Sequence, residues 1–117
     1  MEQYKKLVED NLKDLDIGIL YLNAGGGAVS LFQNLSNEEL EFIIRLNLLH
    51  VFYLLKALIN KQLARDKQSG VMITSSGLGE FPCCGVLTYS GCKSAVSNLA
   101  MGLSKEYEGK NIDFVAF

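Results

Sequence analysis

The sequence has little of what marks several classes of protein. Its 117 residues include one proline, one histidine, three cysteines and no tryptophan. Three cysteines, two of them adjacent, fit neither a disulfide framework nor a zinc site, so no metal is expected. We expect Cys83 and Cys84 to fill a loop as small apolar groups. This cysteine usage favours a reducing, intracellular compartment.

Strong charge and long apolar runs are also lacking. The net charge is only −2, so charge gives no basis for binding nucleic acid or an anionic membrane. The apolar stretch Leu46–Ile59 is interrupted by Asn47, His50 and Lys56, which leaves it too polar to span a bilayer. Met1–Asp14 is charged and amphipathic, unlike a signal peptide. We therefore expect no transmembrane segment.

Apolar periodicity predicts helices and strands that alternate along a single domain. Ile17–Leu22 is a continuous apolar run, typical of a strand buried on both faces. Ser36 and Glu39 form a capping box that opens a long helix, and Gly109 ends a later one. The expected helices cover residues 2–15, 37–65 and 87–108, and the expected strands cover residues 17–22, 70–74 and 112–117. This order predicts an α/β fold with a three-stranded parallel sheet.

The predicted sheet is small for such a fold. Its last strand ends on Phe114–Phe117, which is fully apolar. Whole proteins avoid leaving an apolar edge strand bare. We therefore expect the 117 residues to form part of a larger fold, with pieces missing at both ends.

The long helix carries an apolar stripe at helical spacing. The stripe comprises Leu40, Ile43, Ile44, Leu48, Val51, Leu55, Leu58 and Ile59. Further apolar residues, Phe42 and Tyr53 among them, lie elsewhere on the circumference, so we expect coverage by the sheet on one side and by a partner on another. Asn47 lies within the stripe and requires hydrogen bonds there. It is either a satisfied core asparagine or a functional residue.

Tyr89 and Lys93 are four positions apart, and Ser75 and Ser76 lie just upstream. This spacing puts the phenol and the ammonium on one helix face, one turn apart. A cation held there stabilises a phenolate, and such a phenol can exchange a proton with a substrate oxygen. The alternative is that the pair occurs by chance on a solvated helix.

The order of several motifs is informative. Asn23-Ala24-Gly25 follows the first strand, Asn47 lies inside the long helix, and Ser76 ends the second strand. Tyr89 comes thirteen positions after Ser76, and Lys93 comes four after Tyr89. This arrangement resembles the classical short-chain dehydrogenase/reductase family over nearly the whole chain.

The resemblance implies a Rossmann-type fold that binds NAD or NADP and acts on an alcohol or a ketone. It implies that Tyr89 is the general acid/base and that Lys93 binds the nicotinamide ribose and stabilises the phenolate. It further implies that Ser76 polarises the substrate carbonyl, while Asn47 bends its helix and holds a water in a proton relay. The turn Asn23-Ala24-Gly25 is expected beside the cofactor.

The sequence also departs from the family pattern. Leu22 stands where the family usually has asparagine. The glycine-rich phosphate turn Gly-x-x-x-Gly-x-Gly is absent, since Gly25-Gly26-Gly27 follows a strand that resembles the family's fourth. Residues 1–117 are therefore expected to form a partial Rossmann-like domain that lacks the N-terminal glycine-rich unit and the C-terminal part.

Alternatives for the function stay open. The stretches Ser76–Pro82 and Leu103–Tyr107 resemble hydroxysteroid dehydrogenases and long-chain 3-oxoacyl-CoA reductases, which implies a lipid substrate and attachment to the endoplasmic reticulum. The other hypothesis is a truncated, non-catalytic module, or an incomplete gene, that pairs through its long helices. Homo-oligomers through these helices are expected in either case. We expect His50 to serve packing or an interface rather than catalysis.

Overall fold

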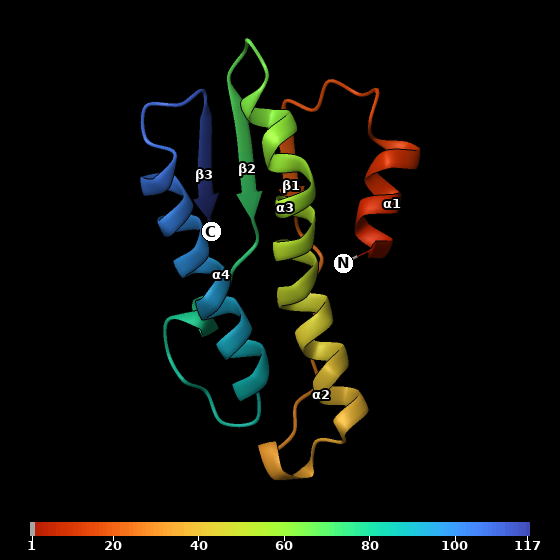
Figure 1. Cartoon of the computed structure of the whole chain (residues 1–117). Helices are drawn as coiled ribbons and strands as arrows, with labels where there is room; N and C mark the ends of the chain where they lie inside the picture. Colours follow the sequence, from red (N-terminus) through yellow and green to blue (C-terminus); the bar gives the residue numbers. More distant parts are fainter. Residues whose placement is uncertain (1) are drawn as a thin grey trace.

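The computed structural model describes residues 2–117, which form one parallel sheet with helices packed on it (Figure 1). In chain order the elements are α1 (Glu2–Asn11), β1 (Ile19–Leu22), α2 (Asn37–Ile44), α3 (His50–Leu63), β2 (Ser69–Ile73), α4 (Leu87–Glu106) and β3 (Ile112–Ala116). Within this range the sheet has three strands in the order β1-β2-β3, all parallel. The predicted fold class is confirmed.

The register of the sheet brings the carboxyl ends of the strands level. Leu22 lies opposite Ile73, and Ile73 lies opposite Ala116. The segments that follow β1 and β2 therefore leave the sheet at the same edge. This edge lies at the bottom of Figure 1, where the strand arrows point.

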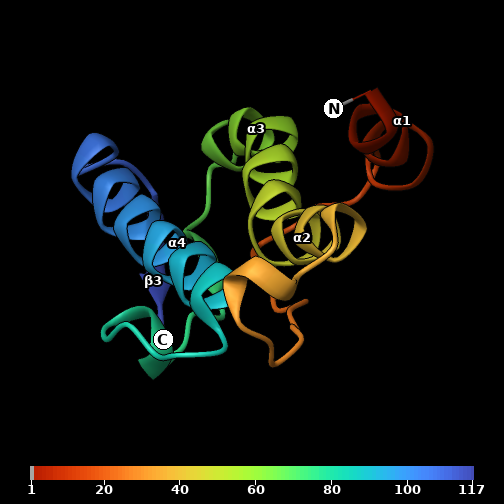
Figure 2. The same cartoon turned by 90° about the horizontal axis from the view of Figure 1, so that it is seen from below.

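One face of the sheet is buried beneath α3 and α4 (Figures 1 and 2). Alternate strand residues fill this core together with residues of the two helices: Leu22, Val71, Ile73, Ile112, Phe114, Val51, Leu55, Ile59, Val96 and Ala100. The predicted stripe of the long helix is thus confirmed as the side that packs inward.

The other face of the sheet is exposed over the described residues. Ile19 is 68% exposed, Tyr21 51% and Val115 48%. The prediction that Ile17–Leu22 is buried on both faces is therefore wrong. Its side chains are apolar on both faces, but the helices of residues 2–117 cover only one of them.

The long helix begins as predicted. Ser36 Oγ accepts from the backbone N–H of Glu39 at 3.1 Å, and Glu39 Oε2 accepts from the backbone N–H of Ser36 at 2.9 Å. This capping box satisfies N–H groups that the first helical turn leaves free. At the end of α4, Gly109 adopts a φ of +77° in the turn that follows the helix.

The helix from Asn37 to Leu63 is long and apolar enough to cross a membrane by length and composition. A core helix of a water-exposed domain satisfies the same criterion. Here Val51, Leu55 and Leu58 are buried within the fold. Packing against the sheet thus accounts for these residues, whereas Phe42 and Phe52 of the same helix stay exposed.

The first helix is shorter than predicted and ends at Asn11 rather than Leu15. The Lys61 ammonium donates to the carbonyl oxygens of Leu12 and Lys13. Carbonyl groups at a helix end have no partner within the helix. The lysine supplies that partner and holds the chain after α1 against α3.

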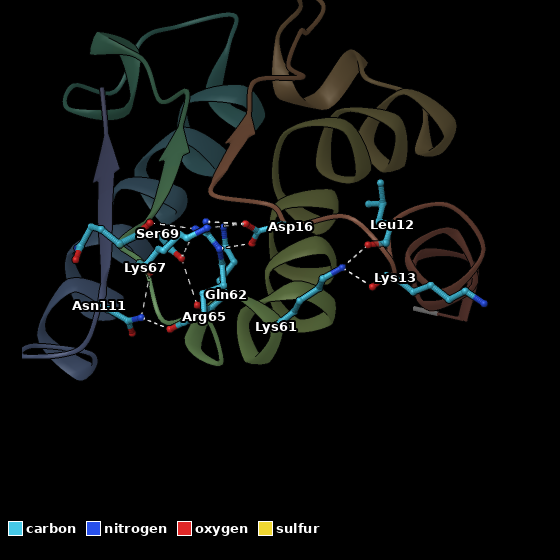
Figure 3. Close-up of polar contacts among 10 residues, drawn as sticks. Leu12, Lys13, Asp16, Lys61, Gln62, Arg65, Lys67, Ser69 and Asn111 are labelled. Atoms are coloured by element: carbon cyan, nitrogen blue, oxygen red, sulfur yellow. Dashed lines mark hydrogen bonds and ion pairs between the residues drawn. The ribbon is translucent and has the colours of Figure 1, made fainter.

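Arg65 connects the amino ends of the strands (Figure 3). Its Nε donates to Asp16 Oδ1 at 2.6 Å, just before β1, and its Nη1 donates to Ser69 Oγ at 3.0 Å, at the start of β2. The Asn111 amide, next to β3, donates to the carbonyl oxygens of Arg65 and Lys67. The Arg65 guanidinium also lowers the pKa of Asp16, chiefly by hydrogen bonding. This cluster holds the strand starts in register.

Arg65→Met should lower the free energy of unfolding by about 1–3 kcal/mol, since it removes charge-assisted hydrogen bonds from a largely buried guanidinium. Lys67→Met is the matched control. Its ammonium pairs with the same Asp16 at 3.9 Å, but both groups are exposed, and such pairs contribute little. Urea unfolding measures both variants, and equal effects would contradict the role of Arg65.

Candidate functional site

The candidate site lies at the carboxyl edge of the sheet, where open α/β sheets bind their ligands. The loop after β1 carries Asn23-Ala24-Gly25, and the loop after β2 carries Ser75 and Ser76. The first turns of α4 supply Tyr89 and Lys93. Because the carboxyl ends of the strands are level, these segments lie close together although they are distant in sequence.

Lys93 is the buried centre of the site. Its side chain is 2% exposed, and Nζ donates to the carbonyl oxygen of Thr74 at 2.7 Å. Nζ also lies 5.5 Å from the centroid of the Tyr89 ring. Burial lowers the pKa of Lys93, and the neighbouring Cys92 partly offsets this. The ammonium and the phenol thus share one face of α4, as the spacing predicted.

Gly25 brings the loop after β1 against this ammonium. A Cβ atom at this position would lie 2.9 Å from Lys93 Nζ and 3.0 Å from Asn47 Oδ1. Any side chain at residue 25 would have to displace one of these groups. Glycine thus permits a close approach that no other residue allows without a shift.

Asn47 is fully buried and bonded to the same loop. Its Nδ2 donates to the carbonyl oxygens of Gly26 at 2.6 Å and Ile43 at 2.8 Å, and its Oδ1 accepts from the Gly26 N–H at 3.1 Å. The helix changes from α to π geometry over Arg45–Leu49, around this residue. Single π turns inside α-helices are frequent at functional sites. The asparagine joins the long helix to the glycine loop.

The adjacent serines have different surroundings. Ser75 is buried, and its Oγ donates to the Lys93 carbonyl oxygen at 3.0 Å and lies 2.5 Å from Ser97 Oγ. Ser76 is partly exposed, and its Oγ accepts from the Leu78 N–H at 3.2 Å. Ser75 therefore fastens α4 to the strand end, while the hydroxyl proton of Ser76 is available to a ligand.

Sequence reasoning missed Thr74. Its carbonyl oxygen accepts from Lys93, and its Oγ1 donates to Asn23 Oδ1 at 2.8 Å. Asn23 and Ala24 are otherwise exposed. The available signal was its place as the first residue after β2, beside the serine pair. Thr74 holds both the ammonium and the start of the glycine loop.

An apolar cleft of about 310 Å³ opens beside Tyr89. It is lined by Gly26, Gly27, Ala28, Val29, Leu78, Val86 and Tyr89. Next to Val29 and Val86 of this lining, the Ser30 N–H donates to the Gly85 carbonyl oxygen at 2.8 Å. Tyr89 is partly exposed. A ligand in this cleft can therefore meet its side chain.

His50 lies one helical turn after Asn47. Its ring nitrogens are buried and have no hydrogen-bond partner within the described residues. Burial lowers the pKa of His50, and the positive charge of Lys93 lowers it further. No cluster of three metal-ligating side chains occurs in the part of the chain that the structure describes.

Comparison with known proteins gives a consistent result. The family model described as short chain dehydrogenase matches residues 1–117. A 3-oxoacyl-[acyl-carrier-protein] reductase, FabG, of Buchnera aphidicola is 31% identical over 108 residues, which are 92% of this chain and 44% of that protein. A very-long-chain 3-oxoacyl-CoA reductase of Mycosarcoma maydis is 31% identical over 113 residues, 95% of this chain and 32% of that protein. The chain spans less than half the length of these relatives.

Solved structures share the fold. A short-chain dehydrogenase/reductase from Burkholderia phymatum, crystallised with NAD, has a TM-score of 0.89 at 19% identity and is matched over 98% of this chain and 42% of its own. A short-chain dehydrogenase from Streptomyces avermitilis has a TM-score of 0.86 at 26% identity, with the same coverage.

The burial of Lys93 predicts a pH dependence of stability. Because its pKa is lowered in the folded chain, the unfolded chain binds more protons between that lowered value and 10.5, the ordinary lysine pKa. The free energy of unfolding should therefore rise with pH across this window. Urea unfolding at several pH values should show a steeper rise for the native chain than for Lys93→Met. The exposed Lys56 provides the control, Lys56→Met, and equal slopes for all three chains would refute the prediction.

Proposed function

Because the chain belongs to the short-chain dehydrogenase family, we propose that it carries the catalytic centre of an NAD(P)-dependent oxidoreductase that interconverts an alcohol and a ketone. The observation that carries this proposal is the buried Lys93 ammonium, held beside Tyr89 and against Gly25. Burying a charge in this way is unfavourable unless it is paired. Its position beside the Tyr89 phenol is the one that proton transfer by Tyr89 requires.

The residues present fit one end of the cofactor, which is NAD or NADP. The loop Asn23-Ala24-Gly25 and the Lys93 ammonium would hold the nicotinamide ribose, because Gly25 brings the loop up to the ammonium without a side chain between them. The cofactor supplies or accepts the hydride. The pyrophosphate end requires a glycine-rich turn at a helix N-terminus, which these 117 residues do not contain.

The protein groups handle the proton. During reduction, Tyr89 donates its phenolic proton to the substrate oxygen, and the carbonyl becomes an alcohol. Ser76, whose hydroxyl proton is available, donates a hydrogen bond to the same oxygen. The nearby positive charge of Lys93 stabilises the phenolate that remains. Asn47 fixes the glycine loop on which this geometry depends.

The cleft beside Tyr89 favours an apolar substrate. Ala28, Val29, Leu78 and Val86 supply its walls. Both a steroid and a long acyl chain would satisfy such a surface, and the names of the curated relatives, both 3-oxoacyl reductases, favour the acyl chain. We therefore propose a 3-oxoacyl thioester as the substrate.

A groove between α3 and α4 favours a role in subunit pairing. It has a volume of about 220 Å³ and is lined by Phe52, Leu55, Lys56, Ile59, Leu99, Leu103, Glu106 and Tyr107. Phe52 is 42% exposed at its rim. This surface would form a homodimer through the long helices, in an enzyme or in a non-catalytic module.

Sedimentation equilibrium tests the pairing. The native chain should form dimers, and Phe52→Lys should be monomeric because it places a charge within an apolar contact. Phe81→Lys makes the same change at a phenylalanine that is 73% exposed on the loop before α4, and it should still form dimers. A native chain that is monomeric at high concentration would rule the pairing out.

Cofactor binding can be tested on the chain itself. Nicotinamide mononucleotide, the half of the cofactor that these residues fit, should shift the amide NMR signals of Asn23, Gly25 and Lys93. Adenosine monophosphate should leave them unchanged. Lys93→Met should abolish the shifts, whereas Lys105→Met, an exposed lysine on the same helix, should retain them. Equal shifts with both nucleotides, or none with nicotinamide mononucleotide, would refute the assigned cofactor contacts.

The role of Tyr89 requires a longer polypeptide that completes the cofactor site. A suitable one replaces the matched segment of the Buchnera reductase with this chain. Tyr89→Phe should then lower kcat by about 100-fold or more with little change in cofactor affinity, measured by NAD(P)H absorbance with a 3-oxoacyl substrate. Tyr53→Phe removes a hydroxyl from a tyrosine that packs on Tyr4 and should have no effect. Near-native turnover in Tyr89→Phe would overturn the assignment.

A further inference from the structure

The adjacent cysteines have no part in the proposed chemistry, and their surroundings differ from the expectation. Cys83 and Cys84 were expected to fill a loop as apolar groups, but both are exposed and free. Cys92 is 4% exposed, and burial raises its pKa. The chain thus presents a pair of accessible thiols and a shielded one.

The pair lies on a tight turn next to the apolar cleft. The Val86 N–H donates to the Cys83 carbonyl oxygen at 3.3 Å, and Gly85 has a φ of +81°, as the third residue of a type II turn requires. The Gly85 carbonyl oxygen accepts from the Ser30 N–H, next to Val29 of the cleft lining. The turn that carries the thiols therefore adjoins the cleft wall at Val86, three residues before Tyr89, although neither cysteine lines the cleft.

A disulfide within the pair is disfavoured by geometry. Consecutive Cα atoms are about 3.8 Å apart across a trans peptide bond, whereas disulfides span roughly 4.4–6.8 Å between Cα atoms. The described peptide bonds are all trans. Closing the ring would strain the turn, so the pair remains available to a reaction partner from outside the chain.

We propose that Cys83 and Cys84 form a modification site for low-molecular-weight disulfides of the glutathione type. A protein thiolate attacks one sulfur of the small disulfide, whose S–S bond breaks as the mixed disulfide forms. The released small thiolate takes up a proton. The neighbouring cysteine cannot displace the adduct without closing the strained ring, so the adduct persists until an external thiol removes it.

The adduct would change the mouth of the cleft. A glutathionyl group carries charges, and on this turn it lies beside the apolar wall that contains Val29 and Val86. Charged groups at that position disfavour entry of an apolar ligand. This consequence rests on the proposed function, whereas the modification itself does not.

Intact mass spectrometry of the whole chain after incubation with oxidised glutathione tests the site. The expected result is a glutathionyl adduct that peptide mapping places on Cys83 or Cys84 and not on Cys92. Cys83→Ser and Cys84→Ser should each still accept an adduct, Cys92→Ser should behave as the native chain, and the double variant Cys83→Ser/Cys84→Ser should accept none.

Three outcomes would overturn the proposal. The first is a loss of two hydrogens without an adduct, which would indicate a disulfide within the pair. The second is an adduct on Cys92, and the third is the absence of any adduct. Circular dichroism of the double variant provides the folding control, since both cysteines are exposed and their replacement by serine should leave the fold unchanged.

Discussion

The site depends on how a buried ammonium is accommodated. Lys93 is almost completely removed from solvent and is held by the carbonyl oxygen of Thr74. A charge in such a position must be paired or solvated by fixed dipoles, so the end of β2 has to stay where it is relative to α4. Gly25 is then constrained because a Cβ atom there would lie 2.9 Å from Lys93 Nζ, and Asn47 is constrained because it is hydrogen-bonded to Gly26 of the same loop. The arrangement of the site follows from this single requirement.

Contacts at the opposite edge of the sheet hold the strands in the positions that the site at the carboxyl edge requires. Arg65 and Asn111 connect the amino ends of the strands through side-chain contacts to Asp16 and Ser69 and to backbone carbonyl groups. Because the strands are parallel and in fixed register, alignment at one edge imposes alignment at the other. A polar cluster at the opposite edge therefore sets the positions of the loops that form the candidate site.

Much of this could be read from the sequence, and the exceptions have physical causes. The capping box at Ser36 and the alternation of helices and strands depend on local patterns of residues, which are visible in the sequence itself. The convergence of Gly25 on Lys93 depends on strand register, and the contribution of Thr74 comes from its backbone as well as its side chain, so neither has a local signature. The exposure of Tyr21 could not be predicted, because an apolar run specifies that a side chain prefers burial and not that a cover is present.

The uncovered face of the sheet determines how the described polypeptide interacts with its surroundings. Tyr21 and Phe117 stack there with ring centroids 5.9 Å apart, beside the exposed Ile19 and Val115. An apolar surface bordered by strands with open hydrogen-bonding edges is the combination that promotes intermolecular strand pairing and precipitation. We therefore expect this uncovered surface to limit the colloidal stability of the polypeptide in isolation, and charged replacements at Ile19 or Val115 are the natural means of improving it.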